Sequence, residues 1–99
     1  MFELFQAEWC PHSGKVRQRL TELGVDFVAR QVAADPESRR GLREDVGEIE
    51  IPVARTEDGR TLAGEEEILA YLDERYGARA PADADAHRRK ALDKAGVPE

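Results

Sequence analysis

The chain has 99 residues, a formal net charge of -6 and a composition that is 40% hydrophobic and 36% charged. This profile indicates a single small globular domain with a modest core. The negative charge argues against nucleic acid or an anionic membrane surface as a partner, because both are bound through clustered cationic side chains.

The start of the chain, residues 1–5, lacks the basic flank and long apolar stretch of a signal peptide, and no later run approaches the roughly 20 apolar residues of a spanning helix. We therefore expect a cytoplasmic protein with no membrane contact. The only cysteine, Cys10, cannot form an internal disulfide and cannot by itself make a four-ligand zinc site, so no metal is expected.

The first half of the chain predicts a strand, a helix and a second strand. Residues 2–6 form a short apolar run suited to a buried strand. Apolar residues at helical spacing then predict a helix over residues 11–23 that ends at Gly24: Val16, Leu20 and Leu23. Residues 25–32 are rich in β-branched and aromatic side chains and predict a strand parallel to the first.

The second half predicts a helix, a hairpin and a last helix. Asp35 and Pro36 begin a helix that ends near Gly47, because the Asp side chain can cap a free N–H and proline is tolerated in the first turn. Strands are expected over residues 49–55 and 61–63, joined by the Asp58-Gly59 turn. Gly64 opens the last helix and Gly77 ends it, with one apolar stripe: Ile68, Leu69, Leu72 and Tyr76.

The predicted fold class is α/β, with the order β-α-β-α-β-β-α and a four-stranded mixed sheet flanked by helices. This domain covers residues 1–77. Residues 78–99 form a polar C-terminal extension with little to bury except Leu92, and a short, weakly held helix is expected over residues 85–95.

Cys10 stands at the first strand-to-helix turn, in the stretch Cys-Pro-His-Ser. An isolated cysteine is more often a small core residue, but a helix N-terminus favours the nucleophilic thiolate. The helix dipole contributes only about 0.3–1 kcal/mol at an exposed site. Further stabilisation must come from hydrogen bonds, and the candidates are the N–H groups of His12 and Ser13 and the Ser13 hydroxyl.

Three stretches together resemble the glutaredoxin family. They are Cys-Pro-His-Ser at residues 10–13, Ile-Pro at 51–52 and Ala-Gly-Glu-Glu at 63–66. The resemblance covers residues 1–77 and implies a thioredoxin-like fold. Residues 65–72 are also similar to the Glu-Ser-x-x-Ile-x-x-Tyr-Leu pattern in the N-terminal domain of glutathione transferases. Transferases append an all-helical domain, whereas the sequence here stops at residue 99, so the glutaredoxin resemblance is preferred.

The resemblance implies a monothiol, glutathione-dependent thiol–disulfide oxidoreductase of cellular redox homeostasis. Cys10 would be the nucleophile and Ser13 would stand where dithiol members have a second cysteine. A cis Ile51–Pro52 bond would present the backbone to the cysteinyl part of glutathione, and the start of the last helix would hold its γ-glutamyl end. The glutathione-binding residues implied are Pro11, His12, Ile51, Pro52, Glu65 and Glu66.

Two positions depart from the family pattern. Members usually carry a lysine three residues before the nucleophile and an arginine or glutamine three before the proline, both near the glycine carboxylate of glutathione. Ala7 and Ile49 occupy these positions. Either another cation substitutes, with four candidates that the sequence does not rank, or the working thiol is not glutathione. The candidates are Lys15, Arg39, Arg40 and Arg43.

The expected co-substrate is therefore glutathione or another small thiol, and the expected partners are protein or small-molecule mixed disulfides. We expect a monomer. The alternative is a non-enzymatic thioredoxin-fold module, either a thiol-binding adaptor or an iron–sulfur carrier in which the Cys10 thiolates of two chains share a cluster.

Overall fold

The computed structural model describes residues 1–79 and 82–95. In chain order its elements are β1 (Phe2–Gln6), α1 (Pro11–Leu23), β2 (Phe27–Gln31), the 3-10 turn η1 (Pro36–Ser38), α2 (Arg40–Val46), β3 (Val53–Arg55), β4 (Thr61–Ala63), α3 (Glu65–Tyr76), the 3-10 turn η2 (Gly77–Arg79) and α4 (Ala84–Lys94). The predicted order of strands and helices through residue 76 is confirmed.

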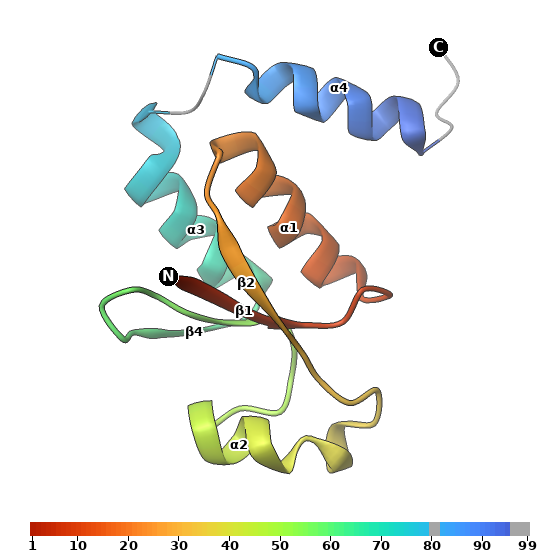
Figure 1. The fold of residues 1–99 in the computed structure, drawn as a ribbon, viewed down its shortest axis with the longest axis vertical. Coiled ribbons are helices and arrows are strands. Elements are labelled where there is room, and N and C mark those ends of the chain that lie inside the picture. Colours follow the sequence, from red (N-terminus) through yellow and green to blue (C-terminus); the bar gives the residue numbers. More distant parts are fainter. Residues whose placement is uncertain (80–81, 96–99) are drawn as a thin grey trace.

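The four strands form one mixed sheet in the order β2-β1-β3-β4. β1 pairs parallel with β2 and antiparallel with β3, and β3 pairs antiparallel with β4. α1 and α3 cover one face of this sheet and α2 lies on the other (Figure 1). The arrangement is the predicted four-stranded mixed sheet flanked by helices.

The main core lies between the sheet and the pair α1 and α3. Its buried residues are Phe2, Leu4, Val16, Leu20, Leu23, Ala54, Leu62, Ile68 and Leu72. A smaller cluster on the opposite face packs α2 onto the sheet: Phe5, Leu42 and Val53. Burial on both faces holds the strands and helices as one unit, and so holds the start of α1 beside the start of α3.

Three predicted boundaries were wrong. β2 covers residues 27–31 rather than 25–32, and the predicted second helix is a 3-10 turn followed by α2. β3 begins at Val53 rather than at residue 49, because Pro52 has no N–H to donate to a neighbouring strand and the chain joins the sheet only after it. Apolar residues 49 and 51 therefore belong to a loop.

The ends of the helices show where glycine acts as a terminator. Gly24 ends α1 in the left-handed conformation, with a φ of 67° and its N–H bonded to backbone carbonyls of the last turn. Gly77 was predicted to end α3, but it has helical angles and continues into η2.

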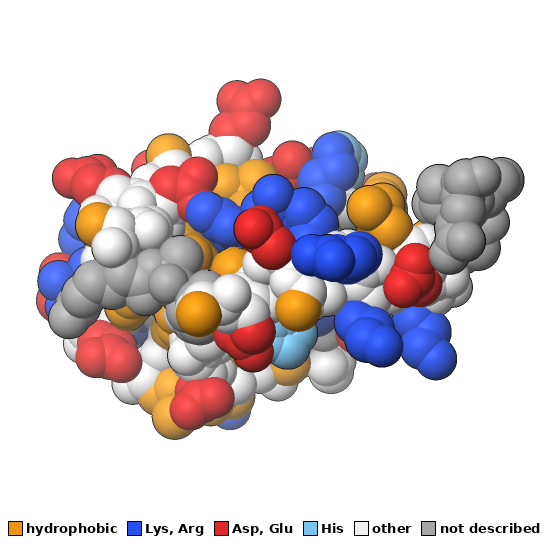
Figure 2. Space-filling view, turned by 90° about the horizontal axis from the view of Figure 1, so that it is seen from above, with side chains coloured by type: hydrophobic (Ala, Val, Ile, Leu, Met, Phe, Trp, Pro, Cys, Tyr) orange, Lys and Arg blue, Asp and Glu red, His pale blue; other side chains and the backbone are white. Residues whose placement is uncertain are grey.

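A helix over residues 84–94, α4, confirms the helix expected in the extension. It lies at the end of the molecule opposite α2 (Figure 1) and contacts α1. None of its residues is buried, so it is held mainly by polar contacts. Lys and Arg side chains gather at this end of the molecule (Figure 2).

No described helix is both long and apolar enough to span a membrane.

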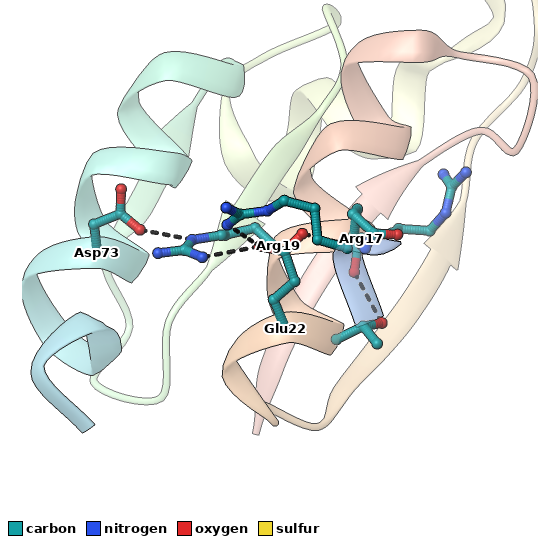
Figure 3. Close-up of polar contacts among 7 residues, drawn as sticks. Arg17, Arg19, Glu22 and Asp73 are labelled. Atoms are coloured by element: carbon teal, nitrogen blue, oxygen red, sulfur yellow. Dashed lines mark hydrogen bonds and ion pairs between the residues drawn. The ribbon is translucent and has the colours of Figure 1, made fainter. Parts of the chain in front are cut away.

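The polar contact that holds α4 centres on Glu22, which is 4% exposed. Its carboxylate accepts hydrogen bonds from Arg88 of α4 at 2.9 Å and from Arg19 at 2.9 Å and Gln18 at 3.2 Å within α1. Arg19 also pairs with Asp73 of α3 at 2.8 Å (Figure 3). One buried carboxylate therefore links α1, α3 and α4, which the sequence analysis did not foresee.

Candidate active site

Cys10 is the residue that caps the N-terminus of α1. Its backbone is extended (φ -75°, ψ 118°), Pro11 opens the helix, and the Cys10 Sγ accepts a hydrogen bond from the Ser13 N–H at 3.5 Å. The Cys10 N–H in turn donates to the Ala7 carbonyl at 3.1 Å. The predicted position of the thiol at a strand-to-helix turn is confirmed.

Ser13 lies on the first turn of α1 and is fully buried. Its hydroxyl has no hydrogen-bond partner among the described residues. Buried hydroxyls are almost always bonded, because leaving one unpaired costs about 1–3 kcal/mol. A thiolate at Cys10 would give this hydroxyl an acceptor that the neutral thiol supplies poorly.

The pKa of Cys10 is lowered from its ordinary value by a balance of opposing effects. Burial is the largest single influence and raises the pKa, since only 6% of the residue is exposed. The Ser13 side chain, the N–H groups of Ser13 and His12, and the charge of Arg17 act together in the other direction and outweigh it. The net effect favours the nucleophilic thiolate.

Arg17 is a part of this site that the sequence analysis missed. It lies two helical turns after Cys10, on the same face of α1, and this spacing is the signal that would have identified it. Its guanidinium donates to the side-chain oxygen of Gln6 and contacts the Glu8 carboxylate at 3.2 Å. Gln6 is buried at the end of β1 and donates onward to Gln31 at 3.1 Å. Through these contacts Arg17 holds the segment that leads to Cys10 in place.

A cavity of about 640 Å³ lies between the start of α1, the Ile51–Pro52 bond and the start of α3. Its lining residues are His12, Lys15, Ile51, Pro52, Ala63, Gly64, Glu65, Glu66 and Glu67. All the residues expected to bind glutathione except the exposed Pro11 are among them. The Ile51–Pro52 bond is cis, as the resemblance implied. Cys10 itself is not among the lining residues, but the cavity joins the start of α1 to segments that are about 40 and 55 residues from Cys10 in the chain.

Three of the polar side chains that line this cavity contact one another. The His12 Nδ1 lies 2.7 Å from the Glu65 carboxylate, and the Lys15 Nζ lies 3.7 Å from it. The Glu67 carboxylate accepts the Ala63 N–H at 2.8 Å. No set of three or more His, Cys, Asp or Glu side chains placed to hold a metal occurs within residues 1–79 and 82–95.

The structure separates the four candidate cations. Lys15 is paired with Glu65, as described above. Arg39 is 5% exposed, and its guanidinium donates to the carbonyls of Ala33 at 2.7 Å, Ala34 at 3.1 Å and Ile49 at 2.6 Å. Arg40 and Arg43 are exposed and line a different cavity together with Ile49. Ala7 is 5% exposed, so a lysine at that position would have to emerge from a buried site.

Comparison with known protein sequences and structures shows which proteins this chain resembles. No curated protein sequence matches it. Among solved structures it is similar to a rice glutathione transferase crystallised with glutathione (25% identity, TM-score 0.67, covering 91% of this chain and 43% of that one). It is also similar to a glutathione S-transferase from Rhodospirillum rubrum (28% identity, TM-score 0.69, covering 93% of this chain and 43% of that one).

A glutaredoxin 2 from Salmonella typhimurium, solved with glutathione, shares the fold at 19% identity and a TM-score of 0.66, over 74% of this chain and 33% of that one. The chain thus spans less than half the length of these neighbours. The family model described as Glutaredoxin matches residues 2–61. That match covers more than half of the chain, and with the thioredoxin-like fold of its neighbours it shows that the chain belongs to the glutaredoxin family.

Proposed function

We propose that this chain is a monothiol thiol–disulfide oxidoreductase that uses glutathione or another small thiol, with Cys10 as its nucleophile. The observation that carries the proposal is the placement of the Cys10 sulfur at the N-terminus of α1, where its pKa is lowered. The family match and the glutathione-bound rice neighbour support a small-thiol co-substrate.

The exchange would run in two steps. The substrate is a mixed disulfide between the small thiol and a protein or metabolite. The Cys10 thiolate attacks the sulfur that belongs to the small thiol. The S–S bond of the substrate breaks, and the sulfur of the protein or metabolite leaves as a thiolate that takes up a proton. Cys10 now carries the small thiol as a mixed disulfide. The thiolate of a second small-thiol molecule attacks it, which releases the symmetric small-molecule disulfide and regenerates the Cys10 thiolate.

Residue 13 decides which resolving step is available. Because Cys10 is the only cysteine in the sequence, no internal thiol can displace the bound small thiol. The Ser13 hydroxyl instead is positioned to stabilise the Cys10 thiolate as it forms in either step. The cavity at the start of α1, which His12 lines two residues after Cys10, would hold the small thiol, with Ile51 and the start of α3 as its walls.

Intact-mass analysis after mixing with oxidised glutathione tests the proposal. We expect one glutathionyl group on the wild type, its removal by reduced glutathione, and neither adduct nor turnover in Cys10→Ser. Full turnover in Cys10→Ser would overturn the mechanism. A Cys10 that is alkylated readily by iodoacetamide but takes no glutathionyl group would show that the working thiol is not glutathione.

A further inference from the structure

The loop between α2 and β3, residues 47–52, supplies one wall of the cavity proposed to hold the small thiol. Ile51 and Pro52 line the cavity on this side. Among the described turns, loops and helix ends, no backbone-to-backbone hydrogen bond involves residues 48–51. Contacts other than regular secondary structure must therefore fix the position of Ile51.

Two hydrogen bonds hold this loop, one on each side of Ile51. After it, the Pro52 carbonyl accepts the Gly64 N–H at 2.9 Å, which ties the loop to the start of α3. Before it, the Ile49 carbonyl accepts a hydrogen bond from the Arg39 guanidinium at 2.6 Å. Within the described residues, this is the only hydrogen bond that holds the part of the loop before Ile51.

Arg39 is itself held on both sides. Its backbone N–H donates to the Pro36 carbonyl at 3.1 Å, and its own carbonyl accepts the Arg43 N–H at 3.1 Å. Its guanidinium also donates to the carbonyls of Ala33 at 2.7 Å and Ala34 at 3.1 Å, in the segment that follows β2. One planar group with several donors in fixed directions therefore ties the loop to that segment.

The Arg39 guanidinium is buried without a counter-ion. Arg39 is 5% exposed, and none of the ion pairs in the described parts of the chain involves it. Burying an unpaired charge costs free energy, which the bonds to neutral carbonyls offset in part. An apolar side chain would avoid this cost, but it would leave the Ile49 carbonyl without its donor.

We propose that Arg39 is a positioning residue for the small thiol: it holds the loop before Pro52 in the binding conformation before the thiol arrives. This inference rests on the proposed function and names a residue that sets the affinity of its site. Arg39 does not line the thiol cavity, so it acts through Ile49 and Ile51 and not by contact with the thiol. A loop ordered in advance removes a cost that binding would otherwise have to supply.

Glutathionylation of Cys10 separates affinity from reactivity when its rate is followed by intact mass over a series of oxidised glutathione concentrations. Arg39→Lys keeps the buried charge but lacks the planar fork that reaches three carbonyls. We expect it to raise the half-saturating concentration about three- to ten-fold, as for a loop that keeps the binding conformation about a third to a tenth of the time. The limiting rate and the rate of alkylation by iodoacetamide should not change.

Arg39→Met, which removes all three bonds, should raise the half-saturating concentration at least as much as Arg39→Lys. A measurement on the wild type needs no variant. Without thiol, the backbone NMR order parameters of Ile49 and Glu50 should be close to the rigid-backbone value of about 0.85, and values below about 0.6 would overturn the ordering of the loop in advance.

Two control variants separate positioning from stability and from charge. Leu23→Ala, in the main core, should lower the midpoint of denaturant unfolding without changing the half-saturating concentration. Arg43→Met removes an exposed charge from the same helix, α2, and should change neither.

An unchanged half-saturating concentration in Arg39→Lys, or an equal rise in Leu23→Ala or Arg43→Met, would overturn the positioning role and leave the proposed nucleophile intact. A loss in Arg39→Lys that is equally large for iodoacetamide would assign the effect to Cys10 and would also overturn it. A wild-type Cys10 that takes no glutathionyl group would instead remove the proposed use of glutathione.

Discussion

The two ends of α1 differ in how completely their buried polar side chains are hydrogen-bonded. At the N-terminal end, within the part of the chain that the structure describes, the Ser13 hydroxyl is fully buried without a partner, and the Cys10 sulfur accepts a hydrogen bond of 3.5 Å from the Ser13 N–H. At the C-terminal end Glu22 is almost as buried, yet its carboxylate accepts three hydrogen bonds, two of them from arginines on different helices.

This difference distinguishes the site that we propose to be reactive from a site that stabilises the fold. A satisfied buried network stabilises one arrangement of its helices. A buried donor without an acceptor has a cost, which falls when a charge forms beside it, and the charge expected there is the Cys10 thiolate. Three substitutions on α1 can break or sharpen this comparison.

Ser13→Ala should have the largest effect, because a hydrogen bond to a charged group contributes about 1.5–3 kcal/mol. The variant should raise the pKa of Cys10 and slow its alkylation at neutral pH, as measured by iodoacetamide labelling against pH. Its free energy of unfolding at acidic pH should not fall and should rise if anything, because the substitution removes a buried hydroxyl that has no charged acceptor while Cys10 is a thiol. Ser38→Ala, in the exposed turn η1, is the control.

The pH dependence of stability gives this prediction a second measurement. A lowered pKa means that the folded state releases the Cys10 proton before the unfolded state does. The wild type should therefore gain stability over Cys10→Ala as the pH rises from the folded pKa to the ordinary cysteine value, and keep that gain above it. Ser13→Ala should reduce the gain, and a gain of unchanged size would show that the hydroxyl does not act on the thiolate.

Glu22→Gln should have the next largest effect, on stability rather than on reactivity. It removes the charge that joins Arg19 to Arg88, at a cost of about 1–2 kcal/mol in the free energy of unfolding. Burial raises the pKa of Glu22, but the hydrogen bonds from Arg88, Gln18 and Arg19 lower it overall.

The sign of the Glu22 effect follows from that lowered pKa. The contribution of the Glu22 carboxylate to the free energy of unfolding is fully present above the ordinary glutamate pKa of 4.5. It is lost as the pH falls through the pKa of Glu22 in the folded state. Denaturant unfolding should show the wild type and Glu22→Gln converging in acid, and the pKa of Cys10 should be the same in both. Glu74→Gln, exposed on α3, is the control, and a cost that persists unchanged in acid would contradict the role of the charge.

Arg17→Met should have the smallest effect. Its guanidinium is partly solvated, with 23% of the side chain exposed, so its charge acts on the thiolate with about 0.2–1 kcal/mol. Labelling against pH should show a slightly raised Cys10 pKa at low salt and no difference from the wild type at high salt. Arg75→Met on α3 serves as the comparison, and an Arg17→Met effect that salt does not alter would point to loss of bracing around Gln6 instead.

Local signals in the sequence were sufficient for most of the fold. Apolar spacing and Gly24 predicted the bounds of α1, and the Asp58-Gly59 turn predicted the strand that follows it, β4; the Cys10 cap is a local feature too. The predicted element boundaries were wrong where the preference of single residues for a strand or a helix end disagreed with the backbone of the folded chain. Residues 49–52 have strand-like side chains, but Pro52 cannot donate a hydrogen bond, and Gly77 is a helix breaker that here continues as a turn of helix.

The candidate site was predicted through motifs rather than through contacts. The stretches at residues 10–13, 51–52 and 65–66 were singled out, and the structure brings most of them to one cavity. Arg17 and the role of Arg39 were missed, because nothing in a single sequence shows which arginine reaches which carbonyl or carboxylate. Long side chains choose partners only after the backbone has brought distant segments together.

The sequence by itself therefore determined the element order and the position of the proposed nucleophile, since capping, helical period and the presence of one cysteine are properties of short stretches. Tertiary structure alone decided the electrostatics. It left the Ser13 hydroxyl without a partner among the described residues and assigned Arg39 to backbone carbonyls. It also placed three glutamates in one cavity and three arginines in another. Charge interactions depend on distance and burial, and both are set by how the chain packs.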